Sequence, residues 1–254
     1  MLTIGFSTGA LALGDFVRGL RLLETKHVDA VELSAIRAVE LPEMLAKLPL
    51  HLEGLKERYR YISFHAPTDF KDEYGLVEQL TNIAKLGLNI VIHPDTIRDI
   101  SLWRTLGSYV CLENMDSRKK TGRTAKELYT FFNDLSQAKL CFDVAHARQV
   151  DPTMTEAACI LSEFGDRLAQ VHLSEVDGRG KHFAMSYGAK LAYEQFSEVL
   201  SEVPVILESI VSEEDIDSEI TKARVILTHH LRYDLRNDSK KNILHPEHTH
   251  IAGE

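Results

Sequence analysis

Six residues that can bind a metal ion recur along the chain, each at or next to the end of a short apolar stretch. They are His65, His93, Glu113, Asp143, His172 and Glu208, and successive gaps are 28, 20, 30, 29 and 36 residues. Such a gap is about the length of one strand–helix unit, so this kind of side chain returns once per unit. Imidazole nitrogens and carboxylate oxygens bind divalent cations. Grouped together they would be costly to bury unless they were paired or coordinated, and the pattern therefore predicts a metal centre.

The apolar stretches before these residues have the composition of buried strands. Two further strands are expected over 2–6 and 30–33, which brings the total to eight. Helical signals fill the gaps: after a Gly-rich turn that ends at Gly14, over 41–57 and 76–86, after Thr124, after the pair Asp151-Pro152, and from about residue 213. Apolar strands that alternate with helices are typical of an all-parallel sheet. The sequence predicts an α/β fold, an eight-stranded parallel (β/α)8 TIM barrel, whose strands all end on one face.

Length and composition narrow the class of protein. The 254 residues fit one barrel domain, expected over 1–236, followed by a polar, flexible tail over 237–254. A net charge of -9 disfavours a polyanionic partner, so nucleic acid stays a less favoured alternative. The chain has three cysteines, no apolar run of ~18 residues and no secretory signal, which indicates a cytoplasmic protein without a membrane partner. Neither a Gly-x-Gly-x-x-Gly nor a P-loop pattern is present, and we expect no nucleotide cofactor.

The ordered motifs resemble those of one known superfamily. They are His65-Ala66-Pro67, His93-Pro94, Glu113-Asn114, Asp143-x-x-His146, His172-Leu173-Ser174, His182 and Glu208-Ser209. This order is similar to that of the xylose-isomerase-like TIM barrel superfamily, and the similarity extends from the first strand to Glu208. Two branches are relevant, the metal-dependent sugar isomerases and epimerases, and the apurinic/apyrimidinic endonucleases of the endonuclease IV type.

Resemblance to the isomerase and epimerase branch implies one divalent ion on four residues. Glu113, Asp143, His172 and Glu208 match that set position by position. Glu113 and Glu208 would also act as the catalytic residues, exchanging protons with the carbon next to a carbonyl, while the metal polarises the substrate oxygens. The substrate would be a small sugar or polyol, with or without a phosphate group.

Resemblance to the nuclease branch implies further ions. His65 and His93 match the histidines that share Glu113 with a second metal, and their nitrogen ligands suit zinc, with manganese as the other metal expected here. A third ion would use His146 and His182, but that branch has an aspartate two residues before the second histidine, where this chain has Gly180. The departure weakens the case for phosphodiester hydrolysis, and we favour an isomerase or epimerase. A barrel that binds metal or ligand without turnover is a third alternative.

Three residues outside the motifs have open roles. Lys119, in the basic loop over 114–123, and Arg179, in the long loop after His172, are either contacts for a substrate phosphate or ordinary surface residues. Glu32 ends the second strand, where it either orients a metal-binding histidine or only fills the barrel. An oligomer is compatible with the sequence.

Overall fold

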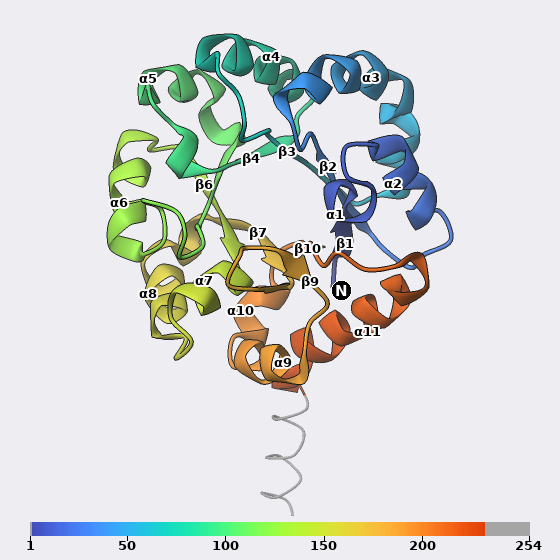
Figure 1. The fold of residues 1–254 in the computed structure, drawn as a ribbon, viewed down its shortest axis with the longest axis vertical. Coiled ribbons are helices and arrows are strands. Elements are labelled where there is room, and N and C mark those ends of the chain that lie inside the picture. Colours follow the sequence, from blue (N-terminus) through green and yellow to red (C-terminus); the bar gives the residue numbers. More distant parts are fainter. Residues whose placement is uncertain (1, 232–254) are drawn as a thin grey trace, which may run out of the picture.

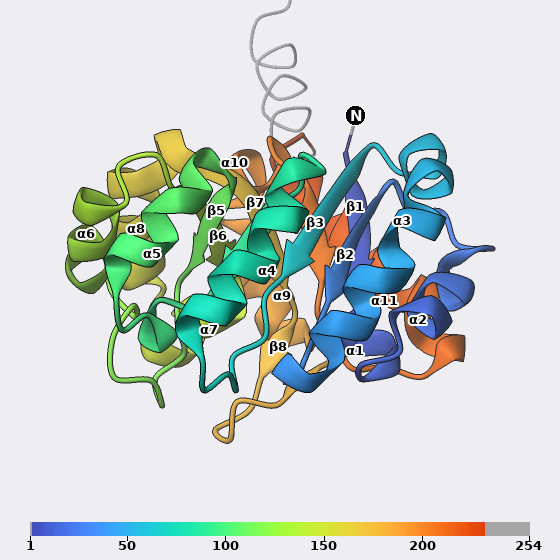
Figure 2. The same cartoon turned by 90° about the horizontal axis from the view of Figure 1, so that it is seen from above.

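The computed structural model describes residues 2–231, and within this range eight parallel strands close a barrel surrounded by helices (Figures 1 and 2). The order around the barrel is β1-β10-β7-β6-β5-β4-β3-β2, with β1 also paired to β2. The barrel strands are β1 (Ile4–Ser7), β2 (Ala30–Ser34), β3 (Tyr61–His65), β4 (Asn89–Ile92), β5 (Val110–Glu113), β6 (Lys139–Asp143), β7 (Leu168–Leu173) and β10 (Val205–Leu207). The predicted (β/α)8 TIM barrel is confirmed.

Helices cover the outside of the barrel, as Figure 1 shows. The α-helices of the described residues are α1 (Thr8–Ala12), α2 (Phe16–Leu23), α3 (Leu41–Arg58), α4 (Glu73–Lys85), α5 (Ile100–Trp103), α6 (Ala125–Asp134), α7 (Val144–Val150), α8 (Thr155–Phe164), α9 (Tyr187–Glu194), α10 (Ser197–Ser201) and α11 (Ile216–Leu227). Short 3₁₀ helices are η1 (Ala38–Glu40), η2 (Pro94–Thr96), η3 (Arg104–Tyr109), η4 (Gly165–Arg167) and η5 (Glu213–Asp215). Within the described part of the chain, no helix is long and apolar enough to cross a membrane.

Side chains along each strand alternate between the helices and the barrel interior. Residues such as Phe6, Leu33, Phe64 and Phe142 join the large core cluster beneath the helices, and all four are fully buried. The residues between them face inward, where the described apolar cluster is small: Val91, Cys111 and Cys141, with Ala169 against them. The rest of the interior is strongly polar, so the apolar core that holds the fold together lies mainly between strands and helices.

The strand register brings the predicted ligands to one face. Asp143 is the register partner of His172, and Glu113 of Cys141. Between β1 and β2, a Cβ on Gly5 would collide with the backbone carbonyl of Ala30, so only glycine permits these two strands to approach this closely.

Several connections differ from the sequence predictions. The Gly-rich turn contains α1, whose first residue Thr8 accepts a hydrogen bond from the Ser34 backbone (3.0 Å). The helix expected directly after Asp151-Pro152 begins later, because Asp151 accepts hydrogen bonds from the Thr153 and Glu156 amides (both 2.9 Å) and holds a turn before α8. The last α-helix likewise begins after η5. The long loop after β7 contains a hairpin, β8 (Glu175–Val176) and β9 (His182–Phe183). The expected tail, 237–254, lies outside the described residues.

Candidate metal centre

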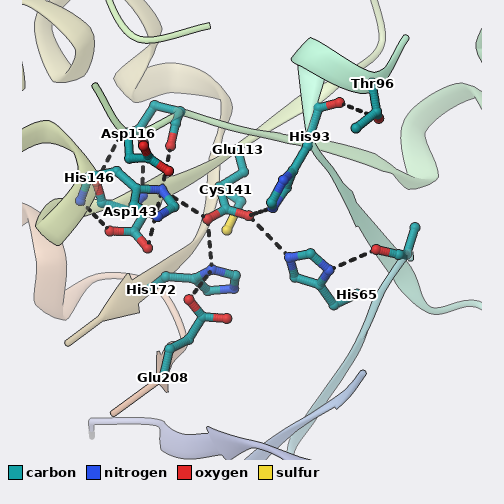
Figure 3. Close-up of polar contacts among 12 residues, drawn as sticks. His65, His93, Thr96, Glu113, Asp116, Cys141, Asp143, His146, His172 and Glu208 are labelled. Carbon is teal, nitrogen blue, oxygen red and sulfur yellow. Dashed lines mark hydrogen bonds and ion pairs between the residues drawn. The ribbon is translucent and has the colours of Figure 1, made fainter. Parts of the chain in front are cut away.

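Glu113 lies at the centre of the site, at the end of β5, and its side chain is 1% exposed (Figure 3). One carboxylate oxygen, Oε2, lies 3.2 Å from Nε2 of His65 and 3.1 Å from Nε2 of His93. The other, Oε1, lies 3.3 Å from Nδ1 of His146 and 3.4 Å from Nδ1 of His172. One carboxylate thus contacts four histidines. His65 and His172 belong to β3 and β7, and His93 and His146 lie in the segments that follow β4 and β6.

The four residues expected to hold one ion come together with ligand atoms within 4.8 Å of one another: Glu113, Asp143, His172 and Glu208. Nδ1 of His172 is 3.4 Å from Oε2 of Glu208, the same distance as from Glu113. Two of the set carry a buried atom without a hydrogen-bond partner, Oδ2 of Asp143 and Nδ1 of His172. Buried polar atoms are rarely left unpaired, and a divalent cation between them would satisfy both. The residues therefore fit a metal ion.

His65 and His93 form a second group with Glu113. Nδ1 of His65 lies 2.9 Å from the Ala66 carbonyl, to which it can donate its proton. In the neutral imidazole that bond keeps the proton on Nδ1, which leaves Nε2 available to a metal ion, a common way to prepare an imidazole for metal binding. His93 presents Nε2 to the same oxygen, and its ring lies edge-on to that of His65 at 5.0 Å between centroids.

Asp143, His146 and His182 form a third group. Oδ1 of Asp143 caps α7 by accepting the His146 amide at 2.7 Å, which leaves Oδ2 for a ligand. His182 reaches the site because β9 pairs with β8, and its Nδ1 lies 2.8 Å from the Ser174 hydroxyl. Asp177 accepts hydrogen bonds from backbone amides within the hairpin loop instead of joining the group. Asp143 thus supplies the carboxylate of this group.

Electrostatics show that the site favours positive charge. Burial disfavours a charged imidazole, yet the hydrogen bond to Glu113 and the neighbouring carboxylates raise the pKa of His65 to about 9. The same competition leaves the pKa of His172 well above its usual value. Burial opposes ionisation of Glu208, but the charge of His172 lowers the pKa of Glu208 to about 2. Burial raises the pKa of Asp143. Divalent cations would replace protons in such a cluster.

A hydrogen-bonded chain supports the site from inside the barrel. Oε2 of Glu32 lies 3.1 Å from Nε2 of His172 and accepts from Gln170 (2.8 Å) and Ser63 (3.0 Å). Gln170 in turn accepts from the Tyr61 hydroxyl at 2.6 Å. The sequence raised the contact of Glu32 with a histidine as one alternative but missed Gln170, Ser63 and Tyr61. Because strand side chains repeat every two residues, polar residues two before His65 and His172 were the available signal.

Asn114 is a further residue whose structural task was missed. It is fully buried, its Nδ2 donates to the Asp143 carbonyl, and its Oδ1 accepts the Asp143 amide, both at 2.8 Å. Its own carbonyl lies 2.9 Å from Nδ1 of His146. One amide side chain therefore fixes the ends of β5 and β6 relative to each other, which places two of the carboxylates.

A cavity of about 330 Å³ opens on the metal-binding residues, and it reaches Lys119 of the basic loop. Lys119 forms an ion pair with Asp95 at 3.0 Å. Arg179 is not among the described residues that line the cavity; its carbonyl accepts a hydrogen bond from Arg118. The hairpin that carries His182 projects beyond the barrel on the face where the strands end (Figure 2).

The fold has many solved relatives. A 3-keto-D-glucoside 4-epimerase, YcjR, from E. coli aligns with a TM-score of 0.55 and 16% identity over 89% of this chain and 100% of that one. The IolI protein with a bound zinc atom aligns with a TM-score of 0.59 and 17% identity over 89% of this chain and 98% of that one. The chain is a TIM barrel similar in fold to these proteins. A barrel of this kind from Mycobacterium smegmatis, in complex with magnesium, aligns with a TM-score of 0.56 and 13% identity over 90% of this chain and 98% of that one.

Sequence comparison adds nothing to this assignment, since no family model and no curated protein matches the chain. The TM-scores of 0.55–0.59 establish the fold of the chain. At identities of 13–17%, the reaction must be inferred from the residues of the site.

Proposed function

We propose that this protein is a divalent-metal-dependent isomerase or epimerase of a small sugar or polyol. The observation that carries the proposal is the position of two glutamates about one histidine. Oε1 of Glu113 and Oε2 of Glu208 both lie 3.4 Å from Nδ1 of His172, on two sides of its ring (Figure 3). Nδ1 itself and Oδ2 of Asp143 are buried without partners, which supports an ion held by all four residues.

A divalent ion at these residues would polarise the carbonyl and hydroxyl oxygens of an α-hydroxycarbonyl sugar. Glu113 and Glu208 are then placed to handle the proton on the carbon next to the carbonyl. In an isomerisation, the carboxylate that takes the proton returns it to the neighbouring carbon. In an epimerisation, the proton must return from the opposite face, which requires a second acid–base group, and Glu113 and Glu208 would be the two groups.

The structural relatives support this reaction class. One is named as a sugar epimerase, and another solved structure with this fold, from Salmonella typhimurium, is named as a xylose isomerase domain protein. Zinc and magnesium are the metals named for two further relatives. For this chain we propose zinc or manganese, because the site combines imidazole nitrogens with carboxylate oxygens.

Solvent exchange of a substrate proton tests the proposal. Metal-loaded protein is incubated with D-fructose or D-xylulose in deuterium oxide, and loss of the proton signal next to the carbonyl is followed by NMR. We expect metal-dependent exchange that a chelator abolishes. Glu208→Gln, assayed at saturating metal, should slow exchange by at least about 10²-fold, the usual contribution of an acid–base group. Glu202→Gln, an exposed residue at the other end of β10, is the matched control. No exchange in the metal-loaded protein across a panel of 2-keto sugars would refute the proposal.

Phosphodiester hydrolysis is the second candidate, and a specific observation favours it. His65 with His93, and His146 with His182, add two further ligand groups around Glu113 and Asp143. A carboxylate shared between two ions suits a centre that holds a phosphate and activates water. Metal-dependent cleavage of an abasic-site oligonucleotide, lost in Glu113→Gln, together with absence of proton exchange, would favour this candidate over the first.

A further inference from the structure

The cavity at the metal centre has two unlike sides. The metal-binding residues form one side, and uncharged residues from three other segments form the opposite one. Among the latter, Leu13, Ile36 and Ile210 are apolar side chains that remain 71%, 37% and 39% exposed. Leu13 follows β1 and α1, Ile36 follows β2, and Ile210 follows β10. Because β1 pairs with both β2 and β10, the three residues share one flank of the same opening. A molecule that fills about 330 Å³ at this centre would touch both sides.

Leu13 stands out because its backbone and its side chain are both unfavourable in the free protein. It ends α1 with φ 39° and ψ 68°, in the left-handed region, which is energetically unfavourable for an L-residue with a side chain. Glycine, which follows it at position 14, would take this conformation freely. Neither burial nor backbone preference accounts for leucine here.

The arginine and the lysine that line the cavity are already paired with carboxylates. Arg118 donates to both carboxylate oxygens of Asp116, through Nε and Nη2 at 2.8 Å each, and its remaining nitrogen donates to the Arg179 carbonyl. Lys119 is paired with Asp95 at 3.0 Å. Among the described residues that line the cavity, Arg118 and Lys119 are the lysine and arginine side chains, and a substrate phosphate would have to displace an existing ion pair to reach either of them.

We propose that the substrate is an unphosphorylated sugar or polyol that carries an apolar substituent. The substituent packs against Leu13, Ile36 and Ile210, while the sugar oxygens face Glu113 and Glu208. This inference rests on the proposed isomerase or epimerase function and names its substrate class. The apolar flank then favours ligands that carry the substituent. Arg118 and Lys119, which are already paired with carboxylates, disfavour sugar phosphates, since a buried phosphate without a partner is costly.

Binding of a matched ligand series tests the inference. Methyl and butyl β-D-glucopyranoside, D-glucose and D-glucose 6-phosphate are titrated into the metal-loaded protein by calorimetry. Full burial of a methylene strengthens binding roughly fourfold. Three additional methylenes on a partly exposed wall should therefore make the butyl glucoside bind about 10-fold more tightly than the methyl glucoside, and glucose 6-phosphate should bind no more tightly than glucose.

Variants assign the effect to the flank. Leu13→Ser, and separately Ile210→Ser, should each reduce the butyl-to-methyl ratio by at least about threefold, and both positions are exposed enough for the fold to persist. Leu50→Ser is the matched control, since Leu50 is 83% exposed on α3 and does not line the cavity. A ratio near one in the native protein, an unchanged ratio in both variants, or preferred binding of glucose 6-phosphate would overturn the inference. The proton-exchange assay with D-fructose and D-xylulose is read independently, so its failure marks failure of the proposed function.

Discussion

Glu32→Gln is the substitution that best separates support of the metal centre from metal ligation. Glu32 is fully buried, and its Oε2 lies 3.1 Å from Nε2 of His172, the nitrogen that faces away from the other metal-binding residues. In the neutral imidazole that binds a metal ion, a carboxylate there holds the proton on Nε2, and Nδ1 is thereby left unprotonated toward Glu113 and Glu208. Glutamine keeps the size of the side chain but removes its charge.

The contact between Glu32 and His172 sets the expected size of the effect on metal affinity. A hydrogen bond to a charged group contributes ~1.5–3 kcal/mol, and a neutral amide keeps only part of it. Loss of a residue that orients a metal-binding histidine typically lowers metal affinity ~10–100-fold, which equals about 1.4–2.7 kcal/mol at 1.36 kcal/mol per factor of ten. The two ranges agree. We expect Glu32→Gln to weaken binding at the four-residue site by about 10–100-fold.

The assay is competition for zinc with a chromophoric chelator, with thermal unfolding of the metal-free proteins as a check on the fold. Ser63→Ala is the control, because the uncharged Ser63 hydroxyl donates to the same Oε2 at 3.0 Å and its removal leaves the charge of Glu32 in place. Ser63→Ala should lower the affinity for zinc by less than about threefold. Native affinity in a folded Glu32→Gln protein would refute the argument that this carboxylate prepares His172.

Three further predictions follow from the same geometry. Elemental analysis of untagged protein should give at least one zinc or manganese ion per chain. A single ion that persists in His65→Ala would lie at the four-residue site. A loss of one ion per chain in His65→Ala would instead place an ion at the group of His65 and His93. Asp143→Ala and His172→Ala should abolish proton exchange while the fold persists by circular dichroism, and intact metal affinity in either variant would count against the site. Because the pKa of His172, a member of the four-residue site, is raised well above its usual value, its imidazole is protonated at neutral pH in the metal-free protein. Zinc binding at that site should therefore release protons, measured as a dependence of binding enthalpy on the buffer, and no dependence would contradict the prediction.

The sequence predicted the barrel and the convergence of its six candidate ligands because both depend on one-dimensional periodicity. Buried strands at regular spacing determine which ends share a face, and the structure indeed brings Glu113, Asp143, His172 and Glu208 within 4.8 Å of one another. The hydrogen bond between the Thr124 hydroxyl and the Glu127 amide, 3.2 Å, was likewise readable because helix caps are local.

What the sequence left open depends on side chains that meet across the barrel. Glu32 and His172 are separated by 140 positions, and Gln170 and Tyr61 by 109. No local pattern links them. The late start of α8 had a different cause: Asp151 was assigned to a helix cap, but its carboxylate serves a turn in which Met154 takes a left-handed conformation. The apolar flank at Leu13 was missed because an exposed leucine on its own is unremarkable in sequence.

The roles of Glu113 in the two candidate reactions are mutually exclusive, and its surroundings explain why the number of bound ions decides the chemistry. Oε1 faces His146 and His172, and Oε2 faces His65 and His93. If only the four-residue site is occupied, Oε2 is free to accept a substrate proton. If the group of His65 and His93 also holds an ion, both oxygens are ligands and Glu113 has no basic oxygen left for a carbon-bound proton. A second ion at His65 and His93 would thus leave Glu208 as the remaining carboxylate for proton transfer and remove the pair of bases that the proposed epimerisation requires.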